Sequence, residues 1–131
     1  MKTLLFCAIL AGFAPAFASD FDQTVNITIN DFAPYFTVPG QQSSRQVAQV
    51  PFGAKIVWYN STGVYHTIQF LECPGECPAV LNAQGREAIY MNDSAALSSF
   101  LAPGRYVYQC GIHDIMRGEF EVLEPGASSQ L

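Results

Sequence analysis

Hydrophobic and polar residues alternate along several short stretches of the chain. In Thr24–Ile29, β-branched residues are common and every second residue is apolar, the pattern of a strand with one buried face. Strand-like stretches follow at Lys55–Tyr59, Arg105–Gln109 and Arg117–Leu123. The chain is therefore expected to form short β-strands.

Residues that favour chain reversal separate these stretches. Proline and glycine preset or permit the dihedral angles of tight turns. Short strands between frequent turns predict an all-β sandwich, and 131 residues without an internal repeat predict one domain. The segment 80–99 is less regular, and there we expect a helical turn near Ser94–Leu97 with irregular loop. The turn-forming residues are Pro39-Gly40, Phe52-Gly53, Ser61-Thr62-Gly63, Pro74-Gly75 and Pro103-Gly104.

The N-terminus has the three parts of a secretory signal peptide: a positive start, an apolar run and small residues at a cleavage site. We expect a signal peptide at residues 1–18 and an exported domain at 19–131, with a flexible tail over 124–131. The apolar run is shorter than the ~18 residues of a membrane-spanning helix. No membrane insertion is therefore expected.

The composition is acidic. The formal charge is -5 at pH 7, and removal of residues 1–18, which contain one lysine and no acid, changes it to -6. This balance argues against nucleic acid and anionic membranes as partners. It favours a protein partner with a basic surface, or a partner chosen without any electrostatic preference.

Side chains that bind copper gather in one short segment. Cys110, His113 and Met116 lie within seven residues, in a loop between two expected strands. The chain has only one other histidine, His66. Thiolate, imidazole and thioether together suit an ion that must be stable as both Cu(I) and Cu(II). We therefore expect one copper ion on His66, Cys110, His113 and Met116.

Each of these residues taken alone has a simpler interpretation. A single histidine on a strand is usually hydrogen-bonded and half-buried, and a single cysteine is usually a small buried hydrophobe. A methionine usually fills the core, which is our expectation for Met91. The copper site depends on the combination, and a metal-free structural or adhesive β-sandwich is the alternative from another class.

The segment from Tyr108 to Gly118 resembles the copper loop of the cupredoxins, the type 1 blue-copper proteins. Its Cys-x2-His-x2-Met spacing is most similar to that of the amicyanins, although Asp114 and Ile115 stand where amicyanins have prolines. Val50–Asn60 resembles the family's strand before the first histidine. The resemblance implies a Greek-key β-sandwich with copper at one end, and hydrogen bonds from Asn60 that tie the two ligand segments together.

The same resemblance implies a soluble electron carrier rather than an enzyme, since four protein ligands leave no open position for a substrate. Its partners would be a redox donor and a redox acceptor, for example a dehydrogenase and a c-type cytochrome. We expect a monomer in the periplasm, with the extracellular space as the second choice. Electrons would pass at the edge of His113, on an apolar surface that includes Ile112 and Ile115.

Cys73 and Cys77 form a second cysteine pair, in the run Cys-Pro-Gly-Glu-Cys-Pro. In an exported protein we expect them to form a disulfide that closes a small loop. The run is also similar to the copper-binding motif of the Sco-type delivery proteins. A Cu(I) dithiolate there would make the chain a copper chaperone or storage protein, which is the alternative function.

Overall fold

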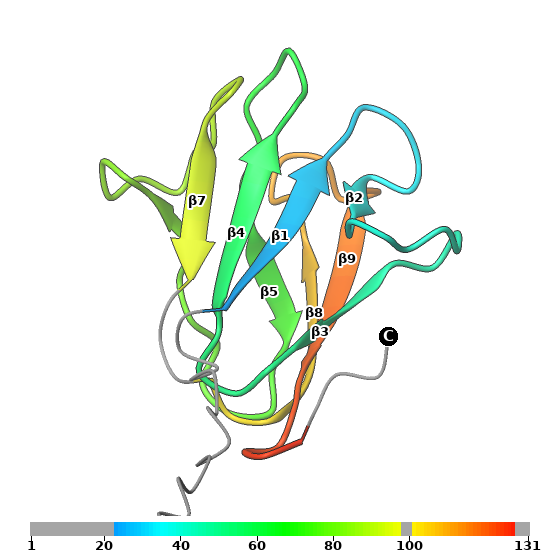
Figure 1. Cartoon of the computed structure of the whole chain (residues 1–131). Coiled ribbons are helices and arrows are strands. Elements are labelled where there is room, and N and C mark those ends of the chain that lie inside the picture. Colours follow the sequence, from blue (N-terminus) through cyan, green and yellow to red (C-terminus); the bar gives the residue numbers. More distant parts are fainter. Residues whose placement is uncertain (1–22, 98–100, 128–131) are drawn as a thin grey trace, which may run out of the picture.

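The computed structural model describes residues 23–97 and 101–127 (Figure 1). The expected signal peptide at residues 1–18 lies outside the described residues, as do positions 128–131 of the expected tail. None of the described residues belongs to a helix that could cross a membrane. The strands of the described part are β1 (Thr24–Ile29), β2 (Phe36–Thr37), β3 (Val47–Val50), β4 (Lys55–Asn60), β5 (Gln69–Glu72), β6 (Leu81–Asn82), β7 (Ser94–Leu97), β8 (Gly104–Gln109) and β9 (Arg117–Val122).

These strands form two sheets that pack against each other (Figure 1). One sheet has the order β2-β1-β4-β7-β6 and the other the order β3-β9-β8-β5. Most neighbouring strands are antiparallel, but β1 runs parallel to β4 and β3 runs parallel to β9. The chain passes repeatedly from one sheet to the other. The all-β, two-sheet sandwich expected from the sequence is confirmed.

The core lies between the sheets because alternate side chains of the central strands point inward. Trp58 of β4 makes an edge-to-face contact with Tyr108 of β8, with ring centroids 5.6 Å apart. Tyr106 stacks on Phe120 of β9 at 4.7 Å. All four rings are buried, and burial of one such side chain contributes about 1.5–3 kcal/mol. This packing fixes β4 and β8, the two strands that lead into the candidate ligand loops.

The segment Ser94–Leu97 is a strand, so the expected helical turn is wrong. It pairs with β4 on one side and with β6 on the other, both antiparallel. Ala95 and Leu97 are buried at alternate positions, as strand geometry requires. Four residues with weak intrinsic strand preference take their conformation here from the two neighbouring strands.

Three loops with candidate functional residues lie at one end of the sandwich. Strands β4 and β8 end there and β7 begins there (Figure 1). The segment 61–66 follows β4, 89–93 precedes β7, and 110–116 joins β8 to β9. An isolated antiparallel bridge between His66 and Ile89 links the first two. Residues far apart in the sequence therefore meet at this end.

Candidate metal centre

Cys110 is the first residue after β8, and it continues the inward alternation of Tyr106 and Tyr108. It is fully buried, and it is the one free cysteine among the described residues. The backbone amide of Thr67 donates a hydrogen bond to its sulfur at 3.5 Å. An amide hydrogen bond stabilises negative charge on sulfur, as a thiolate ligand requires.

His66 is held by the backbone of the opposite loop. Its amide donates to the carbonyl of Ile89 at 3.1 Å, and the amide of Ile89 donates to the carbonyl of His66 at 2.8 Å. His66 is only 3% exposed, and Nδ1 of its imidazole lies 3.6 Å from the sulfur of Cys110. Burial lowers the pKa of His66, and the neighbouring His113 lowers it further, although Asp31 acts in the opposite direction. The geometry and the lowered pKa favour a neutral ring, the form that binds metal.

His113 reaches the same sulfur from within the loop that Cys110 begins. Its Nδ1 lies 3.6 Å from the sulfur of Cys110. The carbonyl of His113 accepts a hydrogen bond from the amide of Met116 at 2.9 Å, which folds the loop back on itself. Unlike His66, His113 is exposed. Its ring is therefore the part of the centre that a second molecule can approach.

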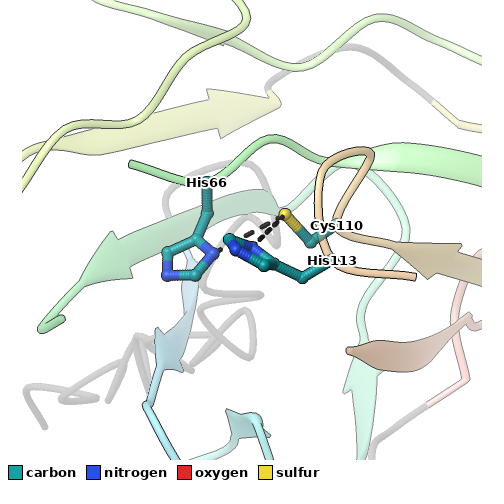
Figure 2. A group of neighbouring side chains, drawn as sticks. All are labelled: His66, Cys110 and His113. Carbon is teal, nitrogen blue, oxygen red and sulfur yellow. Dashed lines mark hydrogen bonds between the residues drawn. The ribbon is translucent and has the colours of Figure 1, made fainter. Parts of the chain in front are cut away.

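The three donor atoms form one cluster, in which His66, Cys110 and His113 turn their ring nitrogens and sulfur toward one point (Figure 2). All of them lie within 4.8 Å of one another. The two imidazole rings are 5.2 Å apart, centre to centre, and are inclined by 56°. Two imidazoles and a cysteine sulfur at this spacing are the ligand types of a copper site that serves both oxidation states.

Met116, the fourth expected ligand, lies in the same loop and is buried, with 4% exposure. Its carbonyl accepts a hydrogen bond from the amide of Cys110 at 3.0 Å, and its amide is bonded to His113 as described above. The loop 110–116 is thus closed at both ends by its own backbone. This closure keeps Met116 next to the two ligand candidates that precede it.

Asn60 does not make the expected hydrogen-bonded link between the two ligand segments. The side chain of Asn60 bonds to Thr62, Val64 and Ile89, none of which is in the cysteine loop. Thr67 makes the link instead: its amide bonds to the sulfur of Cys110, and its hydroxyl oxygen accepts a hydrogen bond from the amide of Gly111 at 2.9 Å. A threonine directly after His66 gave no signal for this in the sequence, because hydroxyl residues are common in loops.

Cys73 and Cys77 form a disulfide, as expected. The pair closes a small loop directly after β5. Its sulfur atoms are therefore not thiolates. Among the described residues, Cys110 is therefore the cysteine that is free to bind a metal as a thiolate.

An apolar hollow of about 660 Å³ lies beside His113. Ile112 lines it and is exposed, and Ile115 nearby in the loop is exposed too, as expected. Met91 also lines it and is 59% exposed, so the expectation that Met91 fills the core is wrong. Met91 lies in a turn with Asn92, whose φ of 62° directs the chain around the end of the sandwich before β7 begins.

The sequence did not indicate the rest of this hollow. Val64 and Tyr65 come from the loop after β4, and Tyr90 comes from the loop before β7. The rings of Tyr65 and Tyr90 are 6.0 Å apart. Because the bridge between His66 and Ile89 brings the two loops together, residues 25 positions apart form one apolar surface. We call this surface, formed by Val64, Tyr65, Tyr90, Met91, Ile112 and His113, the apolar face.

Comparison with solved structures identifies the fold. The Cu(I) form of a methionine-to-glutamine variant of amicyanin matches with a TM-score of 0.56 and 21% identity, over 77% of this chain and 83% of that one. An oxidized methionine-to-leucine variant of amicyanin gives a TM-score of 0.55 and 20% identity, over 75% and 80% of the two chains. No protein-family model matches the sequence, and no curated protein matches it. The chain has a cupredoxin fold that resembles the fold of amicyanin.

Proposed function

We propose that the chain is an exported blue-copper electron carrier, with one copper ion held by His66, Cys110, His113 and Met116. The observation that carries the proposal is the convergence of two imidazoles on the sulfur of a buried free cysteine. Cys110 lies 44 positions from His66, so this arrangement depends on the whole fold. Copper, when bound, supplies a single-electron step between Cu(II) and Cu(I).

The residues around the site suit electron transfer better than catalysis. Two imidazoles, a thiolate and a thioether complete the ligand set, whereas a catalytic metal keeps a position open for water or substrate. Three of these four residues are buried. The described backbone and side-chain hydrogen bonds hold the ligand loops in place, so little rearrangement accompanies a change in charge. The chain is therefore not expected to be an enzyme.

The apolar face is the proposed route for electrons. His113 is the exposed member of the cluster, and it lines the hollow together with apolar and aromatic side chains. A partner that covers this hollow comes into contact with the ring edge of one ligand and excludes water around it. We infer that a donor redox protein and an acceptor redox protein dock here in turn, with a dehydrogenase and a c-type cytochrome as the two types proposed.

The disulfide between Cys73 and Cys77 supports an oxidising compartment. Together with the expected signal peptide at residues 1–18, it supports export, and we propose the periplasm as the location. The net charge of -6 after removal of that segment favours partners with a basic surface.

The alternative function, copper delivery or storage, needs thiolates at Cys73 and Cys77. Their sulfur atoms are joined to each other, so no observation favours this alternative. Thiol titration of the unfolded, metal-free chain 19–131 distinguishes the two. The electron carrier predicts one reactive thiol, that of Cys110, and a dithiol copper site predicts three.

Voltammetry of the copper-loaded chain tests the proposed function. We expect one reversible single-electron wave, with the copper retained in both oxidation states. Loss of copper on reduction, or slow and irreversible electron exchange, would contradict an electron carrier. A metal-free structural sandwich would give no wave at all after copper addition and removal of excess metal.

A further inference from the structure

A buried polar network lies behind His66, on the side of the ring away from Cys110. Asn60 is 0% exposed and Thr62 is 1% exposed, and both belong to the segment that leads from β4 to His66. The hydroxyl oxygen of Thr62 is 2.8 Å from Nε2 of the His66 ring. Buried polar groups are costly unless each donor meets an acceptor, so the direction of every hydrogen bond in this network can be derived.

The orientation of the Asn60 amide is fixed first. Its nitrogen Nδ2 lies 2.7 Å from the carbonyl of Val64 and 2.8 Å from the carbonyl of Ile89. Carbonyl oxygens only accept, so the NH₂ group must occupy this position and its two protons are both used. The oxygen Oδ1 therefore faces Thr62, whose amide donates to it at 2.9 Å.

The hydroxyl group of Thr62 is fixed next. It lies 2.7 Å from Oδ1 of Asn60 and 2.9 Å from the carbonyl of Val64, and both of these oxygens only accept. Two acceptor oxygens only 2.7 Å apart repel each other unless a proton lies between them, so we place the single hydroxyl proton on the contact to Oδ1 of Asn60. The hydroxyl oxygen then has only lone pairs left for His66, so it can accept from Nε2 and cannot donate to it. The proton of the neutral imidazole is therefore on Nε2.

We propose that Thr62, oriented by Asn60, is a positioning residue that selects the Nε2–H tautomer of His66. This tautomer leaves the lone pair of Nδ1 free, and Nδ1 is the nitrogen 3.6 Å from the sulfur of Cys110. The network thus prepares the ring for metal before any metal binds. Its importance for copper depends on the proposed function, whereas the choice of tautomer does not.

The network also restrains the position of the His66 ring. The carbonyl of Ile89 accepts from both the backbone of His66 and the side chain of Asn60. The hydroxyl of Thr62 fixes the far edge of the ring at Nε2. Partners of this kind on a metal-binding histidine typically contribute about 10- to 100-fold to metal affinity.

Nitrogen-15 NMR of the histidine rings in the metal-free chain 19–131 tests the tautomer without copper. At about pH 8, above the ordinary histidine pKa, we expect wild type to show His66 as the Nε2–H tautomer. Thr62→Ser keeps the hydroxyl and should keep this tautomer. Thr62→Val removes the acceptor and should give a mixture of tautomers. An Nδ1–H tautomer in wild type, or an unchanged tautomer in a folded Thr62→Val variant, overturns the proposal.

Copper affinity provides the second measurement, by competition with a Cu(I) chelator. We expect Thr62→Val to bind about 10- to 100-fold more weakly than wild type, and Thr62→Ser to bind as wild type does. Equal affinity of all three overturns the role of Thr62 toward the metal. If wild type shows the Nε2–H tautomer but binds no copper, the proposed function fails and the tautomer assignment stands. If Thr62→Val does not fold, the tautomer of His66 in wild type alone confirms or overturns the proposal.

Discussion

Thr67 contacts the cysteine loop twice, through its amide to the sulfur of Cys110 at 3.5 Å and through its hydroxyl oxygen to the amide of Gly111 at 2.9 Å. Since Thr67 directly follows His66, one residue connects the two segments that together carry the four proposed ligands. The first contact depends only on the backbone, so no substitution other than proline removes it. The second depends on the side chain and can be removed alone.

Thr67→Val should therefore destabilise the metal-free chain by about 0.5–1.5 kcal/mol, the net value of one hydrogen bond. Valine has nearly the same shape, so the core contacts should change little. Urea denaturation of the metal-free chain measures the difference. Thr67→Ser is the matched control and should retain most of the wild-type stability. A serine variant as unstable as the valine variant would show that the hydroxyl contact to Gly111 contributes nothing.

Met116 should set the reduction potential. A thioether is a weak ligand that favours Cu(I), and an amide oxygen is a harder donor that favours Cu(II). Met116→Gln should therefore lower the potential of the copper-loaded chain, as measured by voltammetry. Met91→Gln is the control, because Met91 is exposed and is not a proposed ligand. If Met116→Gln leaves the potential unaltered, Met116 is not the fourth ligand.

The apolar face should control electron exchange between two copies of the chain. In such an encounter the same face of each copy meets the other, so Met91→Lys places two positive charges against each other. Like charges at an interface are strongly unfavourable, and the self-exchange rate measured by NMR line broadening should fall by about tenfold or more. Leu71→Lys adds the same charge on β5, outside the hollow. Equal self-exchange rates for Met91→Lys and Leu71→Lys would mean that electrons pass through a surface other than the apolar face.

Glu119 should make the free energy of unfolding depend on pH under acidic conditions. A hydrogen bond from Arg45 lowers the pKa of its carboxyl, and Arg105 lowers it too, although partial burial raises it. The folded pKa lies below the unfolded value of 4.5. The resulting stability is therefore present above pH 4.5 and is lost as the pH falls through the folded pKa.

Glu119→Gln should destabilise the chain at pH 7 by up to about 1 kcal/mol, a small effect because solvent screens both ion pairs. The difference in the free energy of unfolding between Glu119→Gln and wild type should become smaller as the pH falls below 4.5. Urea denaturation at several pH values measures both effects. Glu121→Gln is the control, because within the described residues Glu121 forms no ion pair. A constant difference at all pH values would mean that the ion pairs do not contribute.

The sequence predicted the parts that depend on residue type and local pattern. The expected strand Thr24–Ile29 has the same bounds in the structure, because alternation there agrees with burial on one face. The cluster of His66, Cys110 and His113 was predictable because histidine and cysteine are scarce in this chain, so few combinations were possible. The disulfide followed from short spacing and an expected export signal.

Features that depend on tertiary contacts were not predictable. β7 is a strand because β4 and β6 lie on either side of it, and neither neighbour is evident from Ser94–Leu97 alone. Met91 is exposed because of a turn, and hydrophobicity alone assigned it to the core. The role of Thr62 depends on the orientation of the Asn60 amide, which the carbonyl of Ile89, 29 positions along the chain, helps to fix. A hydroxyl residue has too many ordinary roles for its sequence position to reveal this one.

Visible and electron paramagnetic resonance spectra of the copper-loaded chain, compared for wild type and Cys110→Ser, test whether the sulfur of Cys110 binds copper. A thiolate bound to Cu(II) gives an intense charge-transfer band, and serine cannot supply it. We expect an intense band and a type 1 copper signal in wild type, and loss of both in Cys110→Ser. A colourless wild-type protein, or a band that persists in Cys110→Ser, would contradict this expectation.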